Sequence, residues 1–435
     1  MANKLTKDLE IMFGQYVDDF EAACVLSQKA KIFRPADTDM QRAGDVVYRP
    51  QHYHANIVSG LDLSGKSDEF TDLTQRMVPS VMRAPQNVVT VLDAKEMRDD
   101  EHKIDAGRAA GQRLSAQIDI DLSNEVALRA TNVLTTSAAG AGQGTAGKDL
   151  WAAAASMKAN MTMIGVPQGL SRNAFWSADG VRDLAQDLGF RANLNAGTTE
   201  DAYSSARIPN VAGFKSWEVD SAPAIGAGSA AAITLAAVPA HKIEVQDNKP
   251  DDYSIANMTN ITPPPDNRQG VITVSASHGL KIGDAFTVDG VTMVHRITLA
   301  DTAKPQVFRV LGVSGNDITI SPKMLPVNNA DKASRPYANI AKNPASGANI
   351  TVINKVASAP NVFWADGSVE LMLGKLAFPT GEGAQVMTAT TKQGAYLVMA
   401  YQFNILTGKT TCRFTTMYGT NVLIPEYTGL ILPNQ

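Results

Sequence analysis

The spacing of apolar residues changes twice along this chain, and these changes constrain the fold more than any other feature of the sequence. Before about residue 221 the apolar residues recur mainly at helical spacing. Residues 224–356 instead contain short β-type runs, such as "GVITVSA", "DAFTV", "VTMVHRITL", "QVFRVLGV", "DITIS" and "ITVIN". The sequence therefore predicts a small closed β-barrel inserted into a host domain, and we expect this barrel to fold on its own.

Two similar segments flank the predicted insertion, with "NAFWSADGV" (Asn173–Val181) before it and "NVFWADGSV" (Asn361–Val369) after it. In both, a short β run meets Asp-Gly, which favours a turn. "VRDLAQDL" after the first copy has helical spacing, so that copy predicts a strand-turn-helix unit. The aromatic pairs could form a sugar platform, but a β run ending in a tight turn explains the same letters more simply. We interpret the repeat as one structural element used twice.

The host segments contain predicted helices separated by extended segments. Residues 1–33 form an amphipathic helical arm that stops before Arg34-Pro35, because the residue before a proline disfavours helix. Residues 93–135 contain no proline and predict one long helix, and Asp149 is expected to cap a third. "GDVVYRP" and "VPSVMRAPQNVVTV" predict strands on either side of a long loop. The long helix has one apolar stripe, formed by Leu114, Ile118, Leu122, Val126, Ala130 and Val133.

Turn signals predict three hairpins in the second half of the chain. Asp289-Gly290 and Gly315-Asn316 each separate two β runs of the insertion. Near the end, "AYLVMAYQFNILTGKTTCRFTTMYG" predicts a longer hairpin. In its first arm Tyr401, Phe403 and Ile405 alternate onto one face.

Composition excludes several classes of protein. The chain has 435 residues, 44% of them apolar and 19% charged, which is typical of a globular protein with a sizeable core. A formal net charge of −4 without a cluster of Lys and Arg disfavours specific DNA binding. No apolar run is long enough for a spanning helix, and the first residues do not resemble a signal peptide. Cys24 and Cys412 are expected to be buried free thiols.

Candidate catalytic motifs are weak. Gly142–Asp149, "GQGTAGKD", resembles a phosphate-binding loop, but an acid occupies the position of the required hydroxyl. His52 and His54, with Asp62, lack the further ligands of a metal site. The charged run Asp99–Lys103 is more typical of a solvated helix face. We therefore expect no catalytic, cofactor-binding or metal-binding residues, and no enzyme activity.

Five blocks, read in order, resemble the major coat proteins of short-tailed temperate phages: "SQKAKIFRPADTDMQRAGDVVYRP", "LDAKEMRDDEHK", "RPYANI", "NVFWADG" and "CRFTTMYGTNVLIPE". The resemblance implies an α+β fold, the tailed-phage and herpesvirus capsid fold (Hong Kong 97 fold) in its branch with an inserted β-barrel. It implies the following plan: an N-terminal arm (1–40), an E-loop with flanking strands (41–85), a peripheral domain with a spine helix (86–135), an axial domain (136–223), the inserted barrel (224–356), and a return to the axial and peripheral domains (357–435).

The same resemblance implies a major capsid protein that assembles as hexamers and pentamers into an icosahedral shell. The implied partners are other copies of the chain, an internal scaffolding protein, a portal protein at one vertex, and packaged double-stranded DNA contacted non-specifically. No membrane is implied. The shell would assemble in the cytoplasm of a bacterial host and end as the virion capsid. The alternative is a carbohydrate-binding or partner-binding protein whose inserted barrel is the recognition module.

Two loops are candidates for contacts between subunits, because an arm or loop that cannot be buried within one subunit is typically covered by neighbours. The polar excursion at residues 245–268 is expected to project from the barrel and hold neighbouring capsomers together, with a solvated loop without a partner as the alternative. Its contact residues would be Asp247, Lys249, Asp251, Asp252 and Arg268. The corresponding residues of the E-loop would be Asp62, Lys66, Asp68 and Arg76.

Overall fold

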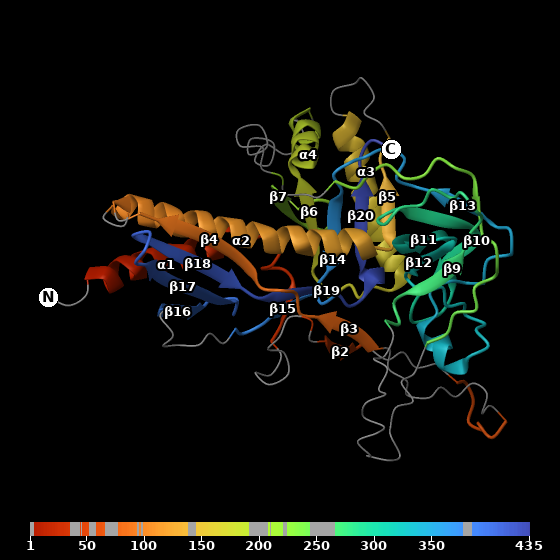
Figure 1. Cartoon of the computed structure of the whole chain (residues 1–435). Helices are drawn as coiled ribbons and strands as arrows, with labels where there is room; N and C mark the ends of the chain where they lie inside the picture. The colour runs from red at the N-terminus through yellow and green to blue at the C-terminus, as the bar shows by residue number, and fades with distance from the viewer. Residues whose placement is uncertain are drawn as a thin grey trace, which may run out of the picture. The chain divides into compact units, whose positions relative to one another are not determined.

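The computed structural model describes residues 4–34, 44, 46–51, 58–65, 77–93, 95–96, 99–137, 145–190, 208, 210–220, 224–243, 266–376 and 385–435. The chain divides into two compact units, each assembled from separate segments of the sequence (Figure 1). The first unit comprises Met1–Val47, Ser80–Glu125 and Val369–Val422. The second comprises Tyr48–Pro79, Val126–Ser368 and Leu423–Gln435.

The first unit is built on a four-stranded antiparallel sheet with strand order β16-β17-β18-β4. Helix α1 packs on one face of this sheet, where the Tyr16 ring lies 4.9 Å from the Phe414 ring. The predicted terminal hairpin is confirmed as β17 and β18, with Tyr401 opposite Cys412. The elements are α1 (Lys4–Ala23), α2 (Asp100–Arg129), β4 (Gln86–Leu92), β16 (Gln385–Thr390), β17 (Tyr396–Asn404) and β18 (Lys409–Thr416).

Two glycines let α1 and α2 approach closely. A Cβ on Gly107 would lie 2.4 Å from the Met12 carbonyl oxygen, and one on Gly111 would lie 2.8 Å from that of Tyr16. The apolar stripe of α1 is consequently buried in its own subunit, and the expectation of an arm that only neighbours could cover is wrong for this helix. The buried stripe consists of Leu9, Met12, Tyr16 and Phe20.

The first helix also ends ten residues earlier than the sequence predicts, at Ala23 rather than residue 33. After it, the backbone N–H groups of Val25 and Ser27 donate to the Asp119 carboxylate of α2 at 2.9 and 3.1 Å. This side chain anchors the turn that redirects the chain into β1 (Lys31–Phe33). β1 joins β15 (Val369–Leu373) and β19 (Tyr418–Val422) in a three-stranded sheet, and β2 (Val46–Pro50) pairs with β3 (Met77–Val81).

The second unit contains a mixed five-stranded sheet with strand order β5-β20-β14-β6-β7. Helices α3 and α4 share one hydrophobic cluster with its central strands, in which Met157 and Leu184 join Trp176 and Phe363. A short 3-10 helix, η4 (Pro425–Tyr427), precedes β20. The other elements are α3 (Thr145–Ile164), α4 (Ala178–Phe190), β5 (Asn132–Thr135), β6 (Arg172–Ser177), β7 (Lys215–Val219), β14 (Asn361–Ala365) and β20 (Thr428–Leu432).

The repeated sequence forms two neighbouring antiparallel strands, β6 and β14, with Phe363 opposite Ala174. The pairing is reciprocal at its ends. Asn173 Nδ2 donates to Asp366 Oδ1 at 2.8 Å, and Asn361 Oδ1 accepts from the Ser177 N–H at 2.9 Å. Each copy thus supports the segment that follows the other, which confirms a structural element used twice.

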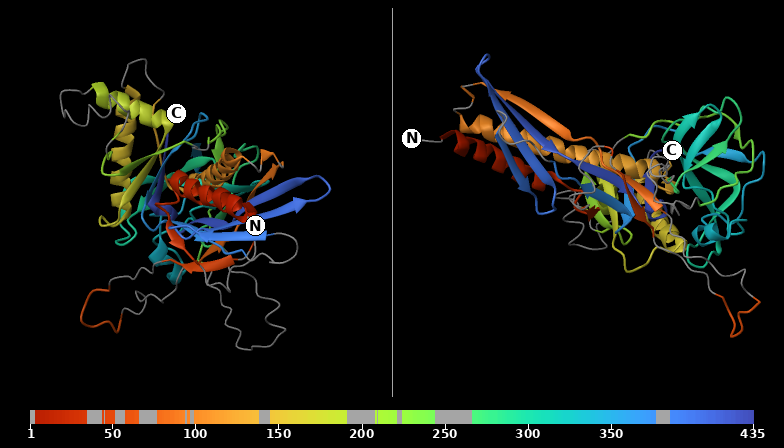
Figure 2. Two further views of the ribbon diagram at one scale, coloured as in Figure 1. Left: turned by 90° about the vertical axis from the view of Figure 1, so that its left-hand side faces the viewer. Right: turned by 60° about the horizontal axis from the view of Figure 1, so that its bottom comes forward.

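The insertion folds as a six-stranded antiparallel barrel with order β8-β13-β10-β11-β12-β9 (Figure 2). A bridge between Leu235 and Val274 joins the two end strands and closes it. Phe286 and Phe308 are fully buried in its core. The elements are β8 (Ile233–Thr234), β9 (Gly270–Thr273), β10 (Ala285–Val294), β11 (Asp301–Ser314), β12 (Asp317–Ser321), η3 (Lys332–Tyr337) and β13 (Asn349–Val352).

Four local predictions need correction. Asp289-Gly290 is not a hairpin turn: it lies inside β10 at an irregularity of the register, where Gly290 has a φ of 77°. Asp179-Gly180 lies in the first turn of α4, and Asp149 lies inside α3. The long helix ends at Arg129, and residues 132–135 form β5 instead. The hairpin at Gly315-Asn316 is confirmed by the pairing of β11 with β12.

Candidate functional site

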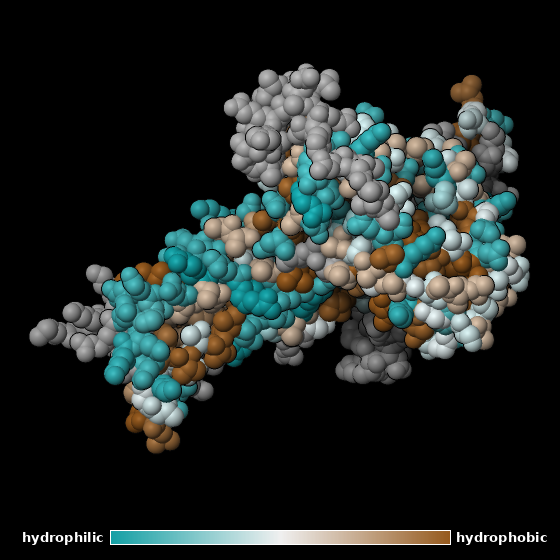
Figure 3. Space-filling model, turned by 90° about the horizontal axis from the view of Figure 1, so that it is seen from above, coloured by the Kyte–Doolittle hydropathy of each residue, from teal (hydrophilic) through white to brown (hydrophobic). Residues whose placement is uncertain are grey.

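The tip of the β17–β18 hairpin exposes three large apolar side chains. Phe403, Ile405 and Leu406 have exposed fractions of 56%, 85% and 96%. Figure 3 shows hydrophobic atoms gathered at the end of this hairpin, at the lower left of the view. Burying one such side chain is worth about 1.5–3 kcal/mol, so an apolar tip of this kind is suited to contact with another molecule.

The four-stranded sheet also leaves a face open on its edge strand β4. Val89 and Val91 have exposed fractions of 59% and 52%, and the face opposite to α1 carries Arg413 and Thr411 beside them on β18. An uncovered strand edge with apolar side chains can pair or pack with another chain. The described part of this sheet thus presents two surfaces suited to association.

The predicted E-loop is described in the structure only at residues 58–65. Leu61 is fully exposed there, and Asp62 Oδ1 accepts bonds from the Ser64 hydroxyl at 2.6 Å and the Ser64 N–H at 2.9 Å. These bonds hold the pKa of the exposed Asp62 carboxyl below its usual value. The other predicted contact residues, Lys66, Asp68 and Arg76, lie outside the described residues.

Arg268, predicted to contact a neighbouring capsomer, is buried and paired within its own chain. Its exposed fraction is 2%, and its guanidinium donates to Asp266 at 2.7 Å, with Arg129 of α2 3.5 Å from the same carboxylate. Burial opposes ionisation of Asp266, but the bonds from Arg268 hold its pKa below the usual value. This geometry removes Arg268 from the predicted contact. The other four residues, Asp247, Lys249, Asp251 and Asp252, lie outside the described part of the chain.

Buried arginines fasten the barrel to the rest of the second unit. Arg309 of β11 donates to the Ala127 carbonyl in the last turn of α2 at 2.5 Å, and burial lowers its pKa to about 10. Arg296 lies 3.9 Å from the Glu426 carboxylate and 5.2 Å from the Tyr427 ring centre. Neither residue was predicted from the sequence to be functional. The sequence did contain an indication for Arg309. This arginine lies within the apolar run "QVFRVLGV", and such a run is typical of a strand buried on both faces.

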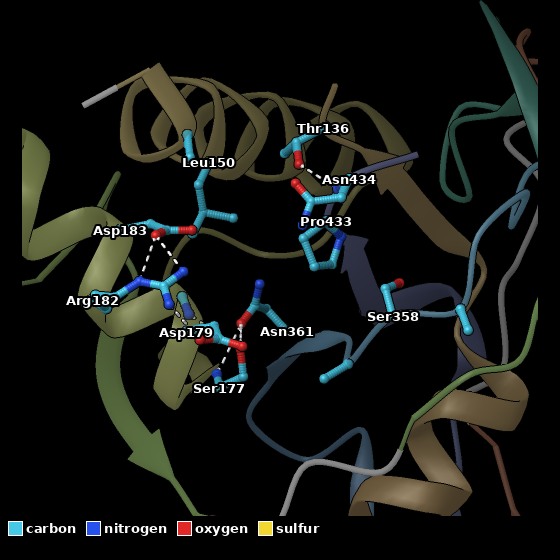
Figure 4. Close-up of a pocket in the computed structure, with 14 residues that line it drawn as sticks. Thr136, Leu150, Ser177, Asp179, Arg182, Asp183, Ser358, Asn361, Pro433 and Asn434 are labelled. Carbon is cyan, nitrogen blue, oxygen red and sulfur yellow. Dashed lines mark hydrogen bonds and ion pairs between the residues drawn. The ribbon is translucent and has the colours of Figure 1, made fainter. Parts of the chain in front are cut away.

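A polar pocket of about 270 Å³ lies at the N-terminal end of α4 (Figure 4). Its polar walls include Asp179, Arg182 and Asp183 of α4 and the fully buried Asn361 of β14. Arg182 is 2.9 Å from each of the two carboxylates. The Asn361 Nδ2 group is buried and has no hydrogen-bond partner among the residues that the structure describes. An unpaired buried donor costs about 1–3 kcal/mol, so this pocket is suited to a bound group with an acceptor.

The remaining candidate motifs can be compared with the structure only where their residues are described. Gly147 and Lys148 of the phosphate-loop resemblance lie within α3, where Gly147 allows a close approach to the Asp183 backbone. Asp99 and His102 are exposed, but Lys103 is buried against Asp100 at 2.8 Å, so the solvated-face interpretation is wrong for this lysine. The described residues include no metal-binding cluster, and His52 and His54 lie outside them.

The aromatic pairs of the repeat are also closed to ligands. Trp176 and Trp364 are fully buried, and Phe175 stacks on Trp364 at 4.0 Å, so they form no sugar platform. Cys24 and Cys412 are buried free thiols as predicted, and burial raises their pKa values to about 12 and about 11. Such thiols are protonated and unreactive at neutral pH. In the described part of the chain, every helix is too short or too polar to span a bilayer.

Comparison with known proteins decides the family. A family model described as "P22 coat protein - gene protein 5" matches residues 1–433. The chain belongs to the P22 coat protein family. Among solved structures, it is similar to the CUS-3 coat protein I-domain, with 54% identity over 29% of this chain and 100% of that one and a TM-score of 0.23. The bacteriophage PhiM1 mature capsid is 9% identical over 94% and 87%, with a TM-score of 0.46. The capsid of cyanophage P-SCSP1u is 10% identical over 95% and 89%, with a TM-score of 0.44.

Membership in the P22 coat protein family confirms the coat-protein resemblance seen in the sequence. The chain is a phage major capsid protein, a structural component of the virion capsid and not an enzyme. The α+β class and the inserted β-barrel are confirmed by the observed sheets and helices. The hairpin tip and the face of β4 that carries Val89 and Val91 are exposed apolar surfaces in the described part of the chain.

Proposed function

We propose that this coat protein assembles as hexamers and pentamers into an icosahedral shell. An internal scaffolding protein guides assembly in the host cytoplasm, a portal protein occupies one vertex, and the finished shell encloses packaged phage double-stranded DNA. The observation that carries the proposal is the exposed hairpin tip, because Phe403, Ile405 and Leu406 have no cover among the described residues of their own unit. A second copy of the chain in a closed shell would supply that cover on every subunit.

The two loops remain proposed contacts between subunits. In the barrel excursion, Asp247, Asp251 and Asp252 with Lys249 would form exposed ion pairs across capsomers. In the E-loop, Asp62, Lys66, Asp68 and Arg76 would contact a neighbouring subunit. Exposed pairs are typically worth less than about 1 kcal/mol each, but a shell repeats each pair on all its subunits. These pairs would therefore determine how neighbouring subunits are oriented in the shell, and each pair would add little to the stability of its own subunit.

Co-expression with the scaffolding protein of the same phage tests the proposal. We expect rapidly sedimenting particles that appear as closed shells of uniform size in negative-stain micrographs. Expression without the scaffold is the control, and it should give fewer or irregular particles. If the co-expressed chain sediments only as small soluble species, the shell proposal is wrong and a recognition module becomes the better account.

A further inference from the structure

The pocket at the N-terminal end of α4 contains one side chain whose orientation the structure fixes. Asn361 Oδ1 accepts from the Ser177 backbone N–H at 2.9 Å and from the Ser177 hydroxyl at 3.1 Å. A backbone N–H can only donate, so the oxygen of the carboxamide must lie on this side. The Nδ2 group therefore points the other way, toward the pocket, as Figure 4 shows.

The first copy of the repeat, in β6, shows which kind of hydrogen-bond partner is missing at Asn361. Asn173 holds the corresponding place in β6, and its Nδ2 donates to an oxygen of Asp366 at 2.8 Å. At Asn361 the corresponding acid would be Asp179, but that carboxylate pairs with Arg182 at 2.9 Å. In the described part of the chain, Asn361 Nδ2 consequently lacks the oxygen acceptor that its counterpart has.

The charges around the pocket select the kind of acceptor. Asp179 and Asp183 contribute two carboxylates and Arg182 one guanidinium, which already contacts both. A further anion would be repelled by the excess negative charge, whereas a neutral carbonyl oxygen would not. The Asp183 carboxylate lines the pocket with its side chain 22% exposed, so it can accept an N–H from the same ligand.

A group that carries a carbonyl oxygen next to an N–H₂ matches both requirements. The rest of the lining is mixed. It includes the polar residues Thr136, Ser358 and Asn434 and an apolar part that can pack against methylene groups beside such a carboxamide. The apolar part consists of Ala146, Leu150, Ala357, Ala359 and Pro433.

We propose that this pocket is a binding site for a primary carboxamide, whose carbonyl accepts from Asn361 Nδ2 and whose N–H₂ donates to Asp183. The carboxamide comes either from an Asn or Gln side chain of another subunit or from a free small molecule. The site does not depend on the shell proposal, because the pocket and its unpaired donor belong to a single chain.

The first test titrates the full-length protein with propionamide and follows saturation-transfer NMR of the ligand. We expect saturable binding with a Kd on the order of millimolar, as suits a ligand of a few atoms. Propionate, which has nearly the same shape and a negative charge, should bind at least about tenfold more weakly. No saturable binding of propionamide would mean that the pocket holds only water, and tighter binding of propionate would contradict the carboxamide class. Either result overturns the proposal.

Two variants locate the site. Asn361→Asp keeps an oxygen for Ser177 and removes the donor, so it should weaken propionamide binding at least about tenfold. Ala146→Phe fills the pocket without changing any hydrogen bond of Asn361 and should abolish binding. Ala159→Phe, at an exposed position of the same helix, is the matched control and should bind as the wild type does. Unchanged binding by folded Ala146→Phe protein would overturn the assignment.

Assembled particles distinguish the two sources of the carboxamide. If a neighbouring subunit fills the pocket, propionamide should bind free subunits and not shells. If the ligand is a free small molecule, both forms should bind it equally.

Discussion

The inserted barrel and the four-stranded sheet of the first unit solve the problem of strand edges in opposite ways. In the barrel, a bridge between Leu235 and Val274 joins the first and last strands of the sheet. The hydrophobic core of the barrel consists of barrel residues. The four-stranded sheet ends in the open strands β4 and β16, and its hairpin tip exposes Ile405 and Leu406. We therefore expect the barrel to fold on its own, and we propose that other chains complete the surface of the open sheet.

The largest expected effect separates the two regions by the same substitution. Phe308→Ala removes a fully buried ring from the barrel core and should lower the free energy of unfolding by about 3–5 kcal/mol. Phe403→Ala, at the exposed hairpin tip, should change it by less than about 0.5 kcal/mol. Urea denaturation followed by hydrogen exchange of barrel and hairpin peptides measures both. Equal effects would contradict the distinction between a self-contained barrel and an open sheet.

The covered face of the open sheet depends on close contact between α1 and α2. Gly107→Ala would place a Cβ 2.4 Å from the Met12 carbonyl oxygen and should cost about 1–3 kcal/mol of stability. Gly14→Ala in α1 meets nothing within 4 Å and should instead stabilise the helix, by up to about 1 kcal/mol. Thermal melts of the two variants provide the comparison. A neutral Gly107→Ala variant would show that the two helices do not need this contact.

Acid should weaken the barrel more than the open sheet. His241 donates from Nε2 to the Val271 carbonyl at 2.8 Å and accepts at Nδ1 from the Met324 N–H at 3.2 Å. Burial lowers the pKa of His241 below its ordinary value of 6.5, and the positive charge of Lys323 acts in the same direction. The unfolded chain therefore binds the proton first as the pH falls. The stabilising contribution of neutral His241 is present above pH 6.5 and is lost as the pH falls toward the lowered pKa.

We accordingly expect the urea midpoint of the barrel peptides to fall between pH 7.5 and 5.5, and His241→Gln to reduce this dependence. His102→Gln is the control, because that imidazole is 60% exposed in α2. A barrel midpoint that stays constant over this range would rule out the contribution of His241.

Elements that bury a regular set of side chains were predictable from the sequence, and features that depend on distant residues were not. Periodicity identified the barrel, the long helix and the β17–β18 hairpin, because each buries one regularly spaced set of side chains. It misplaced the end of α1, because that end depends on the Asp119 carboxylate, which is distant in sequence. The dipeptide Asp289-Gly290 predicted a turn. In the structure it occupies an irregular position inside a long strand, which the same two residues also fit.

The contact surfaces were only partly predictable for a related reason. Phe403 and Ile405 continue the alternation that begins at the buried Tyr401, so the sequence pattern does not show that the two are exposed. Arg268 was predicted to lie at the surface because it belongs to a polar stretch of sequence. Its burial depends on pairing with Asp266, which also contacts Arg129 of the long helix, and the sequence does not show this contact. The polar pocket depends on the pairing of β6 with β14, which the repeat suggested but did not specify.

We propose that the hairpin tip holds subunits together in the shell. The most direct test is sedimentation of the double variant Ile405→Asp and Leu406→Asp, co-expressed with the scaffolding protein. Ile282→Asp serves as the control, because this barrel residue is 64% exposed and has the same chemistry. We predict that the free energy of unfolding of the double-variant subunit lies within about 0.5 kcal/mol of the wild-type value. The double variant should yield no closed shells, while the control should assemble normally. Shells of normal size and yield from the double variant would contradict the account.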